Sequence, residues 1–188
     1  MTLKKKIIQA ATQSFNNNGA KFTLTDITIL IGISKKTIYT EFKSKEDLIM
    51  AMITEGFHDI KVEEKKILNN PQLSTTEKIE KIIIAQPKKF ANLNFSQLIT
   101  LKEKYPDLYK EIHVRIESDW EPTIELIEKG IEEGSIRKIS IPVFKAMIEA
   151  SIEHFLVNPA IQSFEIGYTK ALNEMMAILM TGIIQTKE

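Results

Sequence analysis

The sequence predicts an all-α protein, and two observations support that prediction. Apolar residues recur at intervals of three and four along almost the whole chain, which is the spacing of one face of an α-helix. The alternation of single apolar and polar residues that is typical of a half-buried strand is essentially absent. We therefore expect about nine to ten helices in an N-terminal domain of three helices and a larger helical body.

The composition excludes several classes of protein. The chain has 188 residues, of which 43% are hydrophobic and 27% are charged, as in an ordinary globular protein of one or two domains. It contains no cysteine, so disulfides, thiolate metal sites and cysteine nucleophiles are excluded. No stretch approaches the roughly 18 uncharged apolar residues that a membrane span requires, and no signal peptide is expected. These features favour a cytoplasmic protein without a membrane partner.

The net charge of zero conceals an uneven distribution of charge. Residues 1–50 contain eight lysines and four acids, whereas the remaining residues contain 17 basic and 21 acidic side chains. A basic N-terminal segment on an acidic body indicates an anionic partner for that segment alone. Chance scatter of surface charge is the alternative interpretation at this size of difference.

The first two helices are expected within residues 3–31. An apolar stripe marks the first helix, and Gly19 is its expected left-handed cap. That stripe consists of Leu3, Ile7, Ala10, Ala11, Ser14 and Phe15. Thr25 is the expected N-cap of the second helix, with Asp26 in its first turn. Ile27, Leu30 and Ile31 are expected to form its buried side, and Gly32 to end it.

A third helix follows after a very short turn. Ser34 is its expected N-cap, and it runs from Lys35 to about Phe42. Only Gly32, Ile33 and Ser34 separate it from the second helix. A turn of three or four residues that contains glycine, between two short helices, is typical of a helix-turn-helix. We therefore place a helix-turn-helix DNA-binding domain at residues 1–47.

The body is expected at residues 48–188 and is helical throughout. A fourth helix begins at Ser44 and runs toward Asn69, a length of roughly 30 Å. Further helices are expected at 75–85, 96–103, 106–116, 121–134 and 142–156, and a last helix is capped by Ser163 and closes at Gly182. The sequence leaves open whether the helices at 106–116 and 121–134 form one kinked helix.

Residues 25–48, TDITILIGISKKTIYTEFKSKEDL, resemble the TetR (tetracycline repressor)/AcrR-like family of bacterial transcriptional regulators. The resemblance is carried by Thr25, Ile27, Gly32, Ser34, Thr37, Tyr39, Phe42, Lys45 and Leu48. The chain departs from the family pattern at Thr28, Lys36, Thr40 and Glu41. These departures concern the DNA sequence that is read more than the fold.

The third helix and its neighbours supply the predicted DNA-binding residues. These are Thr25, Ser34, Lys35, Lys36, Thr37, Tyr39, Thr40 and Lys45. A recognition helix presents its N-terminal side chains to base edges in the major groove. Lys35 and Lys36 can donate to guanine or neutralise phosphate, while Thr37 and Thr40 can bond either kind of acceptor or touch a thymine methyl.

The resemblance implies phosphate contacts for Tyr39 and Lys45, and the backbone N–H groups at a helix start offer a further anion site. Glu41 either pairs with Lys45, four residues on, or accepts from cytosine N4. Simpler roles compete: the serines as caps, Tyr39 as a packing residue and the lysines as solvated surface charges.

The last two helices are the predicted dimer interface. One helix-turn-helix covers few base pairs, so such proteins pair two of them on a pseudo-palindromic operator. The final helix is apolar over much of its circumference near Met175 to Met180, which requires wide burial. The resemblance implies a four-helix interface in a homodimer. An intramolecular core is the alternative interpretation.

A ligand pocket is implied mainly by the resemblance. The expected effector is small and hydrophobic or aromatic, and its binding shifts the population of DNA-competent forms. The candidate residues are Phe57, Phe95, Tyr105, Tyr109, His113, Trp120 and Phe155. Aromatic residues at helical spacing more often belong to a core than to a ligand site. No cofactor and no metal site is expected.

The residues argue against an enzyme. The three histidines, His58, His113 and His154, lie in separate predicted helices without a metal-binding spacing, and no glycine-rich phosphate loop is present. The sequence therefore predicts a ligand-responsive transcriptional regulator. We expect a repressor that a small molecule releases from DNA. A helical adaptor that has lost specific DNA binding is the alternative.

Overall fold

The computed structural model of the chain describes residues 1–87, 94–158 and 167–185, except for the side chain of Ser96. Within these ranges the regular elements are helices, and the single extended pairing is an antiparallel bridge between Ile136 and Ile184. The all-α prediction is confirmed. The described part contains no helix that is long and apolar enough to cross a membrane.

The chain divides into two compact units. One consists of Met1–His58 and Asn92–Val114, and the other of Asp59–Ala91 and Arg115–Glu188. The boundaries of these compact units do not fall at residue 47. The functional boundary that the sequence predicts there stays a prediction. The helix α4 (Lys45–Leu68) contributes residues to both units and is about 36 Å long.

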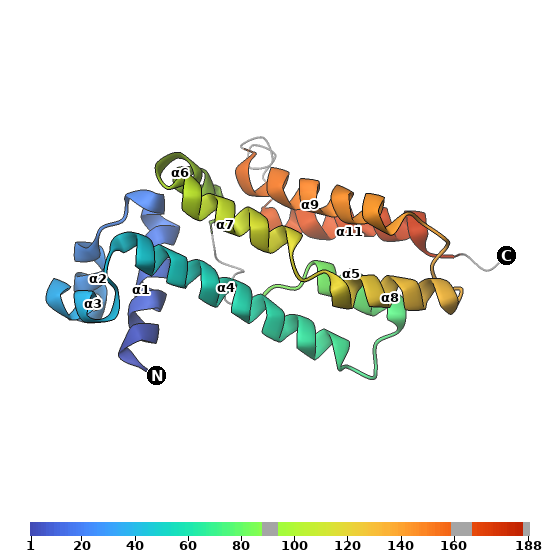
Figure 1. Cartoon of the computed structure of the whole chain (residues 1–188), viewed down its shortest axis with the longest axis horizontal. Coiled ribbons are helices and arrows are strands. Elements are labelled where there is room, and N and C mark those ends of the chain that lie inside the picture. The colour runs from blue at the N-terminus through green and yellow to red at the C-terminus, as the bar shows by residue number, and fades with distance from the viewer. Residues whose placement is uncertain (88–93, 159–166, 186–188) are drawn as a thin grey trace. The chain divides into compact units, whose positions relative to one another are not determined.

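The first unit contains the N-terminal helices, which Figure 1 draws in blue. Its elements are α1 (Leu3–Asn18), the 3-10 segment η1 (Gly19–Lys21), α2 (Leu24–Ile31), α3 (Lys35–Glu41), the start of α4, the 3-10 segment η3 (Phe95–Gln97), α6 (Leu98–Lys104) and most of α7 (Pro106–Glu117). Ile7, Ile27 and Leu48 are among its fully buried side chains. α1 packs against α2, and α6 packs against η1.

The start of α2 differs from the prediction. Thr23, not Thr25, is the N-cap: its hydroxyl accepts from the backbone N–H of Asp26, and the Asp26 carboxylate accepts from the backbone N–H of Thr23. This reciprocal pair is a capping box, which satisfies two N–H groups that a helix start otherwise leaves unpaired. Thr25 therefore lies exposed in the first turn of α2.

The buried side of α2 also differs from the prediction. Ile27 is fully buried, but Leu30 is 43% exposed. At 100° per residue the packed stripe consists of Leu24, Ile27, Thr28 and Ile31, all buried or half-buried. Leu30 lies at the edge of that stripe, so the prediction that it belongs to the core is wrong.

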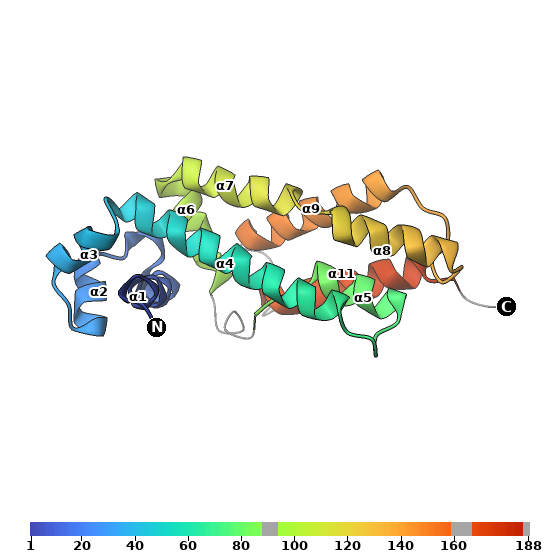
Figure 2. The same cartoon turned by 60° about the horizontal axis from the view of Figure 1, so that its bottom comes forward.

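The second unit is built around one apolar core. It contains α5 (Thr75–Ile83), α8 (Glu121–Glu132), α9 (Ile141–Val157) and α11 (Tyr168–Ile183), and both views show α5 beside α8 and α9 beside α11 (Figures 1 and 2). The core residues are Ile79, Ile82, Leu126, Ile127, Ile136, Phe144, Ile148, Met176, Met180 and Ile183. The predicted cap Ser163 lies outside the described residues.

α7 and α8 are two helices. The break falls at Asp119, the only residue other than glycine with a positive φ, 59°, in the described part of the chain. Such a φ interrupts a right-handed helix. The Trp120 ring nitrogen donates to the carbonyl of Ile116 at 3.0 Å and holds the two helix ends together.

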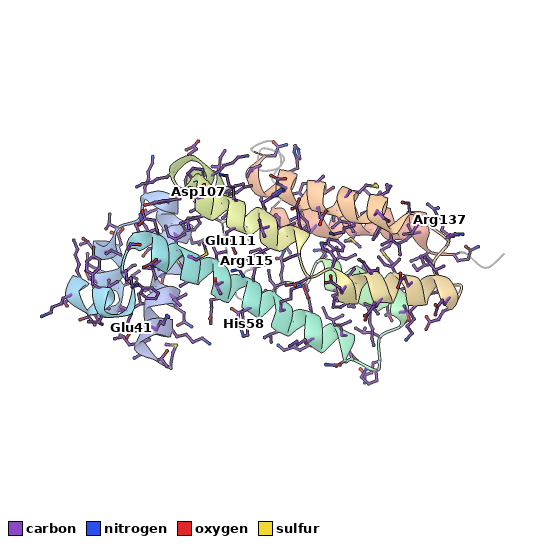
Figure 3. All side chains as sticks on the ribbon, viewed as in Figure 1. Glu41, His58, Asp107, Glu111, Arg115 and Arg137 are labelled. Carbon is purple, nitrogen blue, oxygen red and sulfur yellow. The ribbon has the colours of Figure 1, made fainter. Side chains whose placement is uncertain are left out.

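The turn after α8 fastens the end of α11. The backbone N–H of Arg137 donates to the carbonyl of Ile183 at 2.9 Å, and Arg137 Nε donates to the carbonyl of Gly182 at 2.6 Å. The Arg137 side chain, labelled in Figure 3, thus bonds a carbonyl that the helix end leaves free. Ile136, only 2% exposed, packs onto Gly130 of α8.

Gly130→Ala tests this close approach. A Cβ at residue 130 would lie 2.7 Å from Cγ1 of Ile136. Overpacking of this kind costs about 1–3 kcal/mol, which outweighs the gain of about 1 kcal/mol in helix propensity. We expect a lower urea midpoint for Gly130→Ala. Ile136→Ala removes the obstacle, so in the double variant the two losses should not add, and strict additivity would contradict this packing.

Candidate nucleic-acid interface

The helix-turn-helix is formed by α2, α3 and the turn between them. Gly32 ends α2 in the left-handed conformation, with φ 66° and ψ 38°. That conformation suits glycine, because a side chain would be strained there. Ser34 then begins α3: its hydroxyl accepts from the backbone N–H of Thr37 at 3.1 Å. The predicted turn and the predicted cap are both confirmed.

α3 exposes the side of the helix that carries most of the predicted DNA-binding residues. Ile38 and Phe42 are buried, 1% and 5% exposed, and fix the orientation of the helix. Lys35, Lys36 and Thr40 are exposed, and Tyr39 is 55% exposed. Both interpretations of Tyr39, as a phosphate contact and as a half-buried packing residue, stay predictions at this exposure.

Two hydroxyl groups on α3 are already bonded within the protein. The hydroxyls of Ser34 and Thr37 lie 2.9 Å apart and share a hydrogen bond. The Thr40 hydroxyl donates to the carbonyl of Thr37 at 2.7 Å. With its proton committed to the helix, the oxygen of Thr40 meets a ligand as an acceptor. Such an oxygen matches the amino groups of adenine and cytosine in the major groove.

Lys45 donates hydrogen bonds to main-chain carbonyls of the first unit. Its ammonium donates to the carbonyl of Ala20 at 2.8 Å and also to the carbonyl of Phe22. It lies 4.2 Å from the centre of the Phe22 ring. Burial, followed by the nearby Lys104, lowers the pKa of Lys45. The group is thus bonded inside the first unit, and the phosphate contact that the resemblance implies for it stays a prediction.

The segment that Lys45 bonds is also held from α6. The backbone N–H of Ala20 donates to Oγ1 of Thr100 at 2.8 Å, and Thr100 donates to the carbonyl of Gln97 at 2.6 Å. Gly19 has a φ of 56°, and a Cβ there would lie 2.4 Å from the Thr100 hydroxyl. The connection between α1 and α2 therefore needs both a glycine and a hydroxyl partner. Sequence reasoning missed Thr100, because Thr100 lies 80 positions from Ala20, the residue whose N–H it accepts.

Glu41 does not form the ion pair with Lys45 that the sequence favours. Among the described residues no such pair is found, because the Lys45 ammonium is bonded to the carbonyls of Ala20 and Phe22. Glu41 lies half-buried at the end of α3, where Figure 3 labels it. The first of its two interpretations is wrong.

The predicted ligand-binding residues are divided between the two units. Phe57, Phe95, Tyr105, Tyr109 and His113 belong to the first unit, and Trp120 and Phe155 to the second. Tyr109 is 6% exposed with Lys102 over its ring, and Trp120 packs against the core of the second unit. The role of all seven residues in ligand binding stays a prediction. Within the described residues no cluster of metal-ligating side chains occurs.

The fold and the exposed face of α3 define a helix-turn-helix regulator, and the comparisons give its family. Residues 7–52 match the model of the bacterial regulatory proteins of the tetR family. The resemblance of the N-terminal segment to this family of transcriptional regulators is confirmed. The uncharacterized HTH-type transcriptional regulator YvaF of Bacillus subtilis (strain 168) is 26% identical over 188 residues, which cover 99% of this chain and 98% of YvaF.

Solved structures agree over the full fold. A TetR-family regulator from Cytophaga hutchinsonii has a TM-score of 0.73 at 18% identity, covering 98% of this chain and 96% of that one. The transcriptional regulator FadR from Bacillus subtilis, solved in complex with stearoyl-CoA, has a TM-score of 0.69 at 20% identity, covering 95% and 98%. At such identities the likeness establishes the fold alone.

Lys45→Met tests the internal role of Lys45. The substitution keeps an unbranched apolar side chain but leaves the carbonyls of Ala20 and Phe22 without their charged donor. Loss of such bonds costs about 1–3 kcal/mol, measured as a fall in the free energy of unfolding in urea. Lys43→Met is the matched control: its side chain is exposed, so a change within about 0.5 kcal/mol is expected. Equal effects of the two substitutions would refute the assignment.

Proposed function

We propose that the chain is a repressor that binds a pseudo-palindromic DNA operator as a homodimer and is released by a small hydrophobic or aromatic effector. The proposal rests first on α3. This helix is fixed by two buried residues and presents cations and hydroxyls on its exposed side. We place its action in the cytoplasm, where bacterial DNA lies.

Base reading is assigned to one end and one side of α3. Lys35 and Lys36 stand at its N-terminal end, which enters the major groove first in a helix-turn-helix. Thr37 and Thr40 lie further along the helix, and the Thr40 oxygen is an acceptor. Tyr39 is assigned to a phosphate contact. Thr25 and Ser34 are assigned to contacts that position the starts of α2 and α3 against the DNA backbone.

Glu41 retains one of its two interpretations. A carboxylate at a helix C-terminus is unfavourable to the helix dipole, and near phosphates it is repelled. With Lys45 engaged elsewhere, no ion pair among the described residues offsets these costs. Accepting a hydrogen bond from cytosine N4 is the favourable interaction that duplex DNA offers to this side chain. We therefore assign Glu41 to base reading.

The exposed faces of α9 and α11 support the homodimer. Val143 and Met147 of α9 are 57% and 49% exposed, and Ile178 of α11 is 72% exposed. Exposed apolar side chains on two adjacent helices mark an interaction surface. In the proposed dimer α9 and α11 of each subunit form a four-helix interface, and Phe144 and Met176 of the same two helices belong to the core of the second unit.

Release is proposed to act through α4. This helix supplies Lys45–His58 to the first unit and Asp59–Leu68 to the second, so it is a continuous covalent link between the recognition helix and the body. An effector that binds more tightly to forms with wrongly spaced recognition helices lowers the DNA affinity by that difference. Two proteins that share the fold support a hydrophobic effector. FadR was solved in complex with stearoyl-CoA, and KstR2 of Mycobacterium tuberculosis is a ketosteroid transcriptional regulator.

Duplex DNA of random sequence tests the DNA-binding proposal directly. The wild-type chain should bind it with an affinity that falls steeply as salt rises, because bound cations release counterions from phosphate. Fluorescence anisotropy at several salt concentrations measures this slope. Selection from a random pool should then enrich two half-sites whose centres are one helical turn, about 34–36 Å, apart. Absence of binding at low salt would refute the proposal and favour the adaptor interpretation.

Ile178→Glu tests the homodimer. A charge in the centre of an apolar interface should raise the dimer dissociation constant at least tenfold, which is about 1.4 kcal/mol. Analytical ultracentrifugation across a dilution series measures the change. Val114→Glu is the control, since Val114 is also exposed, at 55%, but lies on α7. A wild-type chain that stays monomeric at micromolar concentration would overturn the interface.

A further inference from the structure

The eight lysines of residues 1–50 divide into two groups in the structure. Lys45 is bonded to carbonyl groups, and Lys5 forms an ion pair with Glu55 of α4 at 3.1 Å. The side chains of the other six are exposed. Among these, Lys35 and Lys36 begin α3, and two more, Lys4 and Lys43, lie at its other end.

Lys43 follows the last residues of α3 directly. It stands between Phe42, the C-cap of α3, and Ser44, whose hydroxyl caps α4 by accepting from the backbone N–H of Asp47 at 3.0 Å. Its backbone N–H donates to the Asp47 carboxylate at 3.1 Å. The main chain of Lys43 is therefore held in place while its ammonium remains at the surface.

Lys4 reaches the same place from α1. Its ammonium lies 5.6 Å from the centre of the Phe42 ring, which fixes the first turn of α1 beside the C-terminal end of α3. Phe42 itself is 5% exposed, so packing fixes the ring over which the Lys4 ammonium lies. Lys4 and Lys43 therefore flank one residue, Phe42, from two segments of the chain.

The acidic residues nearby, Glu41 among them, form no ion pair with Lys4 or Lys43 in the described part of the chain. Asp47 accepts the backbone N–H of Lys43, and Glu46 acts on Lys45 by its charge. The two ammonium groups thus keep their charge for an external anion.

The length of α3 allows cations at its C-terminal end to reach phosphate. Seven residues give a helix of about 10 Å, and the major groove of B-DNA is about 12 Å wide. The groove is about 8.5 Å deep, so when the N-terminal residues of such a helix are at the base edges its C-terminal end can reach the level of the phosphates. Cations at that end can then contact phosphate and fix the register of the helix.

We propose that Lys4 and Lys43 are phosphate-contacting residues that position the C-terminal end of α3 on DNA, and that they take the place of Lys45 in this role. This inference rests on the proposed DNA binding. It assigns the two lysines to affinity and register rather than to sequence choice.

Neutral variants that keep most of the side-chain length test the proposal. The variants are Lys4→Gln and Lys43→Gln, measured as full-length protein by anisotropy on random-sequence duplex between 50 and 200 mM salt. Each loss of a phosphate contact should reduce the salt slope by about 0.9, so the fall in affinity over this range should be about 3.5-fold smaller. The sequence enriched from a random pool should stay the same.

Lys6→Gln and Lys43→Arg are the controls. Lys6 is exposed on α1 but lies 200° around the helix from Lys4, so its loss should leave the slope unchanged. Lys43→Arg keeps the charge and should keep the slope. An unchanged slope in Lys4→Gln and Lys43→Gln, or an equal change in Lys6→Gln, while the wild-type chain binds DNA, would overturn this inference alone. A wild-type chain that does not bind would overturn the proposed function as well.

Discussion

The constraint on which the N-terminal unit depends is the need to bond the backbone of the segment between α1 and α2. Two main-chain bonds form at this turn: the Gly19 N–H donates to the carbonyl of Phe15, and the Phe22 N–H donates to the carbonyl of Gly19. Side chains bond the N–H of Ala20 and the carbonyls of Ala20 and Phe22. The ammonium of Lys45 bonds two carbonyls and the hydroxyl of Thr100 bonds one N–H. Because buried backbone groups are costly when unpaired, the start of α4 and the start of α6 are both fixed to this turn. The helix-turn-helix is therefore anchored by side chains that lie outside it in the sequence.

This anchoring separates stability from DNA contact among residues of the same type. Lys45 is bonded inside the unit, whereas Lys43, two residues earlier, is exposed. Lys5 pairs with Glu55, while Lys4, one residue earlier, lies over Phe42. A helix places neighbouring residues 100° apart, so adjacent lysines in α1 serve different sides of the domain. The basic charge of the first 50 residues is thus partly structural, and only the remainder is available to an anionic partner.

Local chemistry made much of the fold predictable. Caps and helical spacing predict the roles of Gly32 and Ser34 and the burial of Ile38 and Phe42. These roles are predictable because the partners of each residue lie within four positions. The cap of α2 is Thr23 and not the predicted Thr25, and the spacing of Thr23 and Asp26 is itself that of a capping box. Lys45 and Thr100 could not have been predicted in the same way. Their partners lie 23 to 80 residues away, and only the packing of α1, α4 and α6 brings them together.

The engagement of Lys45 changes the meaning of Glu41 as well. An ion pair four residues on would have made this carboxylate a local stabiliser of the turn between α3 and α4. Without it, Glu41 opposes both the dipole of α3 and any phosphate nearby. The lysines at residues 4 and 43 stand at the same end of α3, and their charge compensates that repulsion when phosphate approaches. In the proposed complex, a carboxylate at the same end of α3 as these two lysines can then accept from cytosine N4 without excluding the DNA backbone.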